Sequence, residues 1–150
     1  MSSARSVNRG GFTLLEILVV ITVIAILAAL VSPQVFRNVG DARTATARAQ
    51  VEILTLALDA YRLDNHRYPT TEQGLAALVR PPDGEPLPRN WRGPYLRRGV
   101  PADPWDRPYL YVSPGIHDST GFDLSTLGRD GEPGGEGEDA DVTSWAGLEP

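Results

Sequence analysis

The sequence predicts an α+β fold in which one long N-terminal helix packs against a small antiparallel β-sheet. Two patterns lead to this prediction: an apolar run at residues 12–31 continues into an amphipathic helical pattern, and strand-like segments occur only in the C-terminal half. The chain has 150 residues, no cysteine and a net charge of −5. The lack of cysteine excludes disulfides and thiolate metal sites, and the acidic balance argues against a nucleic-acid-binding surface.

The apolar run has about the ~20 residues that a helix needs to cross a bilayer. Residues 1–11, which precede it, carry two arginines and no acid. The positive-inside rule therefore places the N-terminus in the cytoplasm and the rest of the chain outside it. Gly10 and Gly11 stand before the apolar run, whereas the small-residue site of a secretory signal follows its apolar core. Cleavage there would remove the basic leader and leave the anchor attached.

The helical pattern has two weak points after this run. Pro33 lacks an N–H and clashes with the preceding turn, so we expect a kink or local melting. Gly40 is less favourable in a helix than alanine. The pattern then resumes and predicts a helix that ends between Leu63 and Asn65. Apolar side chains at three- and four-residue spacing predict its buried face: Val51, Leu54, Ala57, Leu58 and Tyr61.

A second, short helix is predicted at residues 71–79. Thr70 can cap its N-terminus, and Gln73 stands three residues later, as in a capping box. Residues 81–108 are rich in proline, glycine and aromatics, and predict a long ordered loop. We expect three aromatic side chains to pin this loop to the long helix: Trp91, Tyr95 and Trp105.

Two strands are predicted after the loop, at residues 109–113 and 122–126. The residues after Trp145 show no pattern that predicts a helix, a strand or a site. The two histidines, His66 and His117, are far apart in sequence and are expected in surface or turn positions. The sequence contains no phosphate-binding loop, dinucleotide fingerprint or nucleophile elbow, and therefore predicts no enzyme.

Glu16 is the one charged residue of the apolar run. A carboxylate inside a membrane span costs at least about 2.5 kcal/mol, which calls for a partner and a purpose. Cleavage after Gly11 would free the amine of Phe12, about one helical turn from Glu16. Glu16 could then pair with its own amine or a neighbour's, and in a stack of subunits such a pair would set the axial register. The alternative is a signal anchor with a carboxylate tolerated near the interface.

Residues 128–141 form a loop rich in glycine and acid. Calcium takes six to eight oxygen ligands from carboxylates and carbonyls in flexible geometry, and the glycines would let the backbone fold around such an ion. The spacing does not fit an EF-hand. On residue chemistry alone, a solvated acidic loop and a calcium site are equally supported. The acidic residues are Asp130, Glu132, Glu136, Glu138, Asp139 and Asp141.

The segment GFTLLEILVVITVIAILAALV, which begins at Gly11, resembles the cleavage and methylation motif of the type IV pilin-like family. The resemblance implies cleavage between Gly11 and Phe12 by a prepilin peptidase, followed by N-methylation of Phe12. It also implies that Glu16 recognises the N-terminus of an adjacent subunit during assembly. The helix break that we expect at Pro33 matches a break found in this family.

Three further segments resemble the major pseudopilins of type II secretion systems: DNHRYPTTEQGLAALV, GVPADPWDRPYLYVSPG and FDLSTLGRDGEPGGEGEDADVTSW. This resemblance implies one bound Ca²⁺ in the C-terminal loop, and so favours the metal site. The implied side-chain ligands are Asp130 and one or both of Asp139 and Asp141. Backbone oxygens of Leu127 and Glu132 complete the implied set.

The resemblance implies a structural subunit of a periplasmic pseudopilus that helps to export folded proteins across the outer membrane. It implies a leader at residues 1–11, the membrane half of the helix at 12–32 and a periplasmic domain at 33–150. The subunit would be a single-pass protein of the bacterial inner membrane. Implied partners are other copies in a helical homopolymer, minor pseudopilins, the prepilin peptidase, the inner-membrane assembly platform, the secretin apparatus and, before assembly, membrane lipid.

Two other functions remain open at this stage. The chain could be a type IV pilin that forms a surface fibre, or a signal-anchored periplasmic domain that never polymerises.

Overall fold

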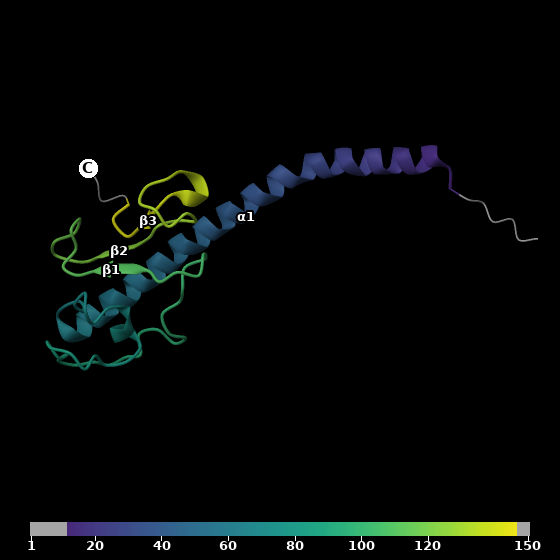
Figure 1. The fold of residues 1–150 in the computed structure, drawn as a ribbon. Helices are drawn as coiled ribbons and strands as arrows, with labels where there is room; N and C mark the ends of the chain where they lie inside the picture. The colour runs from purple at the N-terminus through teal and green to yellow at the C-terminus, as the bar shows by residue number, and fades with distance from the viewer. Residues whose placement is uncertain (1–11, 147–150) are drawn as a thin grey trace, which may run out of the picture. The chain divides into compact units, whose positions relative to one another are not determined.

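A computed structural model describes residues 12–146, and within its long helix the side chains of residues 30–37 lie outside that description. The predicted α+β fold is confirmed (Figure 1). The chain divides into two units, Met1–Asn38 and Val39–Pro150. In chain order the elements are α1 (Leu14–Asn65), the 3₁₀ helix η1 (Leu75–Leu78), β1 (Leu110–Val112), β2 (Asp123–Thr126), the 3₁₀ helix η2 (Gly137–Asp139) and β3 (Val142–Thr143).

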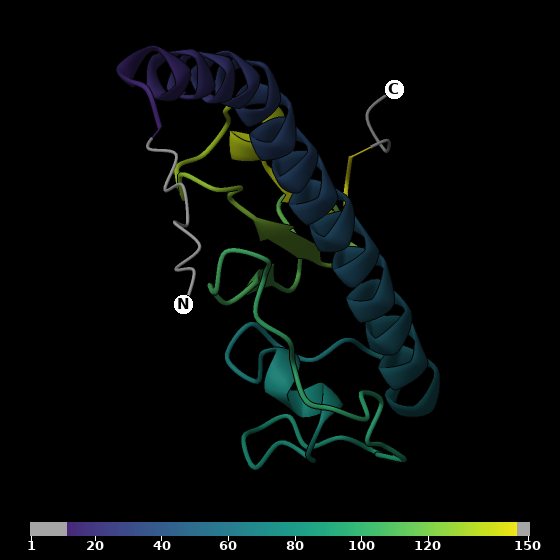
Figure 2. The same cartoon turned by 90° about the vertical axis from the view of Figure 1, so that its right-hand side faces the viewer.

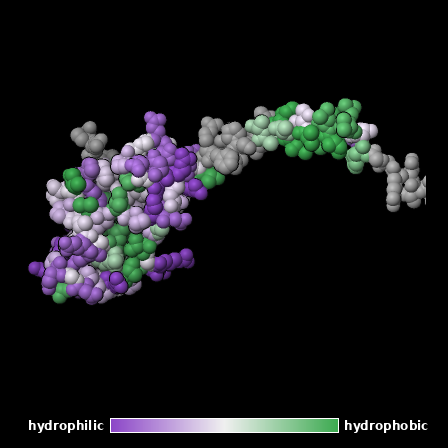
Figure 3. All heavy atoms as spheres, in the orientation of Figure 1, coloured by the Kyte–Doolittle hydropathy of each residue, from purple (hydrophilic) through white to green (hydrophobic). Residues whose placement is uncertain are grey.

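The N-terminal unit is described from Phe12 onward and consists of the first part of α1. Its large apolar side chains, from Leu14 to Leu27, are exposed. Figure 3 shows that the face of this segment turned to the viewer is mostly apolar. Helix α1 continues through Pro33, so the expected local melting at this proline is wrong. The predicted leader, with Gly11, lies outside the described residues.

Among the residues that the structure describes, we find no helix whose length and apolar character would let it cross a membrane.

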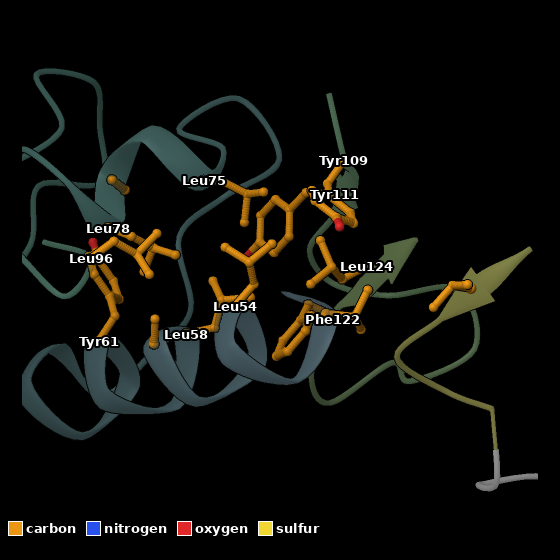
Figure 4. Packing of buried hydrophobic residues seen from close by; sticks show 14 of the residues in the cluster. Leu54, Leu58, Tyr61, Leu75, Leu78, Leu96, Tyr109, Tyr111, Phe122 and Leu124 are labelled. Carbon is orange, nitrogen blue, oxygen red and sulfur yellow. The ribbon is translucent and has the colours of Figure 1, made fainter. Parts of the chain in front are cut away.

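The core of the second unit forms along one face of α1, where the predicted apolar stripe is buried. Leu54, Leu58 and Tyr61 are at most 1% exposed. They face Leu75 and Leu78 of η1 and residues of the sheet (Figure 4). Each fully buried aliphatic or aromatic side chain contributes about 1.5–3 kcal/mol, so this face holds the surrounding loops and strands to the helix.

The predicted second helix exists only as a capped turn followed by η1. The capping box is present: Gln73 N–H donates to Thr70 Oγ1 at 3.2 Å, and Thr70 N–H donates to Gln73 Oε1 at 3.1 Å. Gly74 then takes a φ of +58°, a left-handed conformation that interrupts helical backbone geometry. A continuous α-helix over residues 71–79 was therefore the wrong prediction.

The three aromatic side chains of the long loop have different partners. Tyr95 reaches α1, where its hydroxyl donates to Asp64 Oδ2 at 2.9 Å and its ring meets Tyr61 edge-on. Trp91 Nε1 instead donates to the carbonyl of Ala77 in η1 at 2.9 Å. Trp105 Nε1 donates to Glu138 in the C-terminal loop at 3.1 Å. All three side chains pack against the core cluster to which α1 contributes, as predicted, but among them only Tyr95 hydrogen-bonds to the helix itself.

The sheet has three antiparallel strands in the order β1–β2–β3. Tyr111 pairs with Leu124, and Ser125 pairs with Thr143. β1 and β2 lie within the predicted strands, but β3 was missed because two residues are too short for a readable alternation. Ser144 extends this edge, since its N–H donates to Leu124 O at 2.8 Å.

Asp123 orders the turn between β1 and β2. Its buried carboxylate accepts hydrogen bonds from the N–H groups of Ile116 at 2.8 Å and His117 at 3.0 Å, and its Oδ2 lies 2.9 Å from His117 Nδ1. The His117 ring stacks on Trp145 with centroids 4.1 Å apart. Burial alone would raise the pKa of Asp123, but the hydrogen bonds from His117, Ile116 and Asp118 together lower the pKa below its usual value.

We predict that Asp123→Asn lowers the free energy of unfolding at neutral pH. Because the folded pKa of Asp123 is lowered, its ionised form stabilises the fold above the ordinary value of 3.8, and this contribution is lost as the pH falls through the folded pKa. Urea unfolding followed by tryptophan fluorescence, from pH 7 to about pH 3, should show the two proteins converging. Asp83→Asn, at an exposed position, is the control. A difference that stays constant over this range would contradict the account.

Candidate functional site

Glu16 lies in the first turn of α1, and its backbone N–H donates to Thr13 Oγ1 at 3.2 Å. Thr13 therefore caps the helix. This capping role was not predicted from the sequence, although Thr13 and Glu16 have the spacing of a capping box. Among the described residues, the Glu16 carboxylate has no hydrogen bond or ion pair. Its side chain is exposed in the structure.

The predicted calcium loop is organised by an arginine that the sequence analysis did not single out. Arg129 Nε donates to Asp139 Oδ1 at 2.8 Å, and Arg129 Nη2 donates to Asp139 Oδ2 at 3.0 Å. This two-pronged pair is the strong form of a charge-assisted hydrogen bond. Both oxygens of the Asp139 carboxylate are therefore engaged within the protein.

Glu138 connects this loop to α1. Its Oε1 accepts from Trp105 Nε1 at 3.1 Å and from Arg43 Nη1 at 3.2 Å, while Arg129 Nη1 lies 3.5 Å from its Oε2. The carboxylate lies over Gly40, where an added Cβ would come within 2.9 Å of Glu138 Oε2. The Trp105 hydrogen bond lowers the pKa of Glu138 most; burial opposes it, and the two arginines assist it.

Asp141 has one engaged and one unengaged oxygen. Its Oδ2 accepts the Gly134 N–H at 2.9 Å. Its Oδ1 is buried and has no hydrogen-bond partner within the described part of the chain. A buried carboxylate oxygen without a partner carries a desolvation cost of about 1–3 kcal/mol or more, so this atom fits a cation ligand.

The other predicted ligands lie at the start of the loop. Asp130 Oδ1 accepts the Glu132 N–H at 3.1 Å, and Leu127 O accepts the Gly131 N–H at 3.2 Å. Within residues 12–146, no three acidic or histidine side chains converge as a metal cluster. A cation here would therefore take part of its ligands from backbone carbonyls, which calcium accepts.

We predict that Glu138→Gln destabilises the second unit by about 1–3 kcal/mol, the usual scale for a lost hydrogen bond to a charged group. The change removes the negative charge that faces Arg43 and Arg129. Chemical denaturation at neutral pH measures the effect. Glu136→Gln is the matched control, because Glu136 is exposed on the same loop. Equal stability of the two variants would show that Glu138 does not secure the loop.

Two family models match this chain, one at each of the two sites. The family model described as "Type II secretion system (T2SS), protein G" matches residues 34–145. A second one, "Prokaryotic N-terminal methylation motif", matches residues 7–32. Together the two matches cover the N-terminal motif and the acidic loop.

Similar curated proteins carry the description "Type II secretion system core protein G". The protein from Pseudomonas aeruginosa is 46% identical over 92% of this chain and 96% of its own length. The one from Vibrio cholerae is 48% identical over 90% of both. The solved structure of the major pseudopilin from the type 2 secretion system of enterohaemorrhagic Escherichia coli is 41% identical, with a TM-score of 0.63, and covers 77% of this chain and 97% of that one.

The long helix, the three-stranded sheet and the acidic loop thus occur together with a family match over most of the chain. The chain belongs to the protein G family of type II secretion systems, the major pseudopilins.

Proposed function

We propose that this chain works by assembly and not by catalysis, as the repeating subunit of a periplasmic pseudopilus in type II secretion. The observation that carries the proposal is the adjacency of two family matches, the methylation motif at residues 7–32 and the protein G domain from residue 34. The methylation motif predicts an apolar helix whose N-terminus is cleaved and methylated. The protein G domain predicts a folded unit that continues from the same helix.

The N-terminal apolar run is proposed to anchor the subunit in the inner membrane before assembly and to pack against other subunits afterwards. Prepilin peptidase would cleave between Gly11 and Phe12, and Phe12 would be N-methylated. Glu16 would pair with the new amine of an adjacent subunit. The Glu16 side chain is exposed and has no ion pair among the described residues, and it would need an opposite charge once packing between subunits buried it.

We predict that Glu16→Ala leaves the subunit stable and inserted, but reduces filament yield by about tenfold or more, the scale for loss of one paired buried charge. Negative-stain microscopy of filaments sheared from cells expressing the secretion system measures the yield. Asp83→Ala is the control, because Asp83 is an exposed acid on a loop outside α1. Unchanged yield for Glu16→Ala would sink the pairing proposal.

The acidic loop is proposed to bind one Ca²⁺. The proposed ligands are side chains of Asp130 and Asp141 with backbone oxygens of Leu127 and Glu132. The unpartnered Asp141 Oδ1 favours this residue over Asp139, whose two oxygens are held by Arg129. Bound calcium would neutralise the loop's carboxylates and fix its backbone. It would thus stabilise the loop in a chain that has no cysteine and can form no disulfide.

We predict that calcium raises the melting temperature of the full chain in detergent. An ion at 100 times its Kd, bound only to the folded state, stabilises that state by about 2.7 kcal/mol. Near-ultraviolet circular dichroism with calcium and with excess chelator measures the shift. Asp141→Asn should abolish the response and Asp139→Asn should retain most of it. The reverse pattern would reassign the ligand, and no calcium response in wild type would refute the metal site.

The remaining proposals concern place and partners. The N-terminus is proposed to start in the cytoplasm and the unit from residue 39 to lie in the periplasm. The filament would work with minor pseudopilins, the inner-membrane assembly platform and the outer-membrane secretin. The basic leader before the apolar run supports this orientation.

A further inference from the structure

The second half of α1 carries an apolar seam of seven residues, all of them exposed except the half-buried Ala60. Its members recur at three- and four-residue intervals, and the larger ones, Ile53, Leu56 and Leu63, are 56%, 61% and 79% exposed. The seam consists of Ala42, Ala45, Ala49, Ile53, Leu56, Ala60 and Leu63.

This seam lies almost opposite the buried face of the helix. Successive residues of an α-helix are rotated by about 100°. On that basis the seam centres roughly 150° around α1 from the face that holds Leu54, Leu58 and Tyr61. Figure 2 shows most of the loops of the second unit on one side of this part of the helix, and the C-terminal end emerging on the other side. The helix thus has two apolar faces, of which the fold uses one.

The seam has the organisation of a packing surface. Exposed charged residues, Asp41, Glu52 and Asp59, follow one edge of it. A helix with a single core-facing stripe keeps polar residues on its outer face. Single exposed apolar residues are common on protein surfaces, whereas a contiguous apolar stripe with a polar border marks a contact site.

The same unit carries a groove of mixed apolar and polar lining beside β1. The groove has a volume of about 570 Å³ and lies between the turn that precedes η1, the loop around Val100 and strand β1. Figure 3 shows that apolar patches on this unit are bordered by polar surface. The apolar lining of the groove consists of Leu75, Ala76, Val100, Pro101, Ala102 and Pro108. Thr71, Asp106, Arg107, Tyr109 and Tyr111 line the rest, with Gly74.

We propose that the seam of one subunit docks into the groove beside β1 on the next copy of this chain. The proposal rests on the proposed function as a filament subunit. A polymer that grows without closing needs two different, complementary surfaces on each subunit, because a surface that meets itself gives a closed pair. The convex seam and the concave groove share no residue, and the seam lies on the helix that the proposed function already assigns to subunit packing.

The first test compares two leucines of similar exposure in the full chain. Leu56 is 61% exposed on the seam, and Leu87 is 52% exposed on a loop outside both surfaces. Leu56→Glu should lower the yield of sheared filaments by about tenfold or more, the scale of a contact hot spot. It should leave the melting temperature of the unassembled subunit unchanged, and Leu87→Glu should leave both quantities unchanged.

The second test uses the lack of cysteine in the chain. Filaments of the double variant Leu56→Cys/Val100→Cys should give a ladder of covalent multimers on oxidation, and Leu87→Cys/Val100→Cys should give none. A wild-type chain that forms no filaments would overturn the proposed function itself. Wild-type filaments with normal yield for Leu56→Glu, or with no ladder from the 56–100 pair, would overturn only the seam-and-groove contact.

Discussion

The structure of the second unit depends on the burial of one face of α1. Three strands of two to four residues each cannot form an independent core. They are held because Tyr111, Phe122 and Leu124 pack with the helix residues in one cluster. The long loop is attached to the same helix through Asn65, whose Oδ1 accepts the Asn90 N–H at 3.0 Å and whose Nδ2 donates to Tyr61 O at 3.0 Å. Loss of this helix face would therefore release sheet and loop together.

The C-terminal loop also depends on α1, through hydrogen bonds and ion pairs of polar side chains. Glu138 ties the loop to Arg43 and, through Trp105, to the long connecting loop. The buried Asp103 joins that connecting loop to the sheet. Its carboxylate accepts the Arg107 N–H at 2.8 Å and a hydrogen bond from the Thr126 hydroxyl of β2. Each acid thus holds two segments at once. A calcium ion in the neighbouring loop would act on a segment that is already coupled to α1.

Local patterns predicted the parts of the fold that depend on local contacts. The stripe from Val51 to Tyr61 follows from helical periodicity, and the reciprocal bonds of Thr70 and Gln73 follow from capping chemistry. β3 and the contacts of Glu138 could not be predicted, because each joins residues brought together only by the folded chain. Arg129 shows the same limit for the site: its charge was visible in the sequence, but its choice of Asp139 over Asp141 depends on loop geometry.

A single helix therefore has three proposed tasks, which are anchoring, carrying the folded unit and presenting a contact surface to other copies. The central claim is that copies of this chain stack through α1. Electron cryomicroscopy of filaments formed by the full wild-type chain with its secretion machinery tests that claim most directly. The account predicts a helical assembly with α1 bundled along the axis and the folded units arranged around it. Filaments in which α1 makes no contact with neighbouring copies would contradict it.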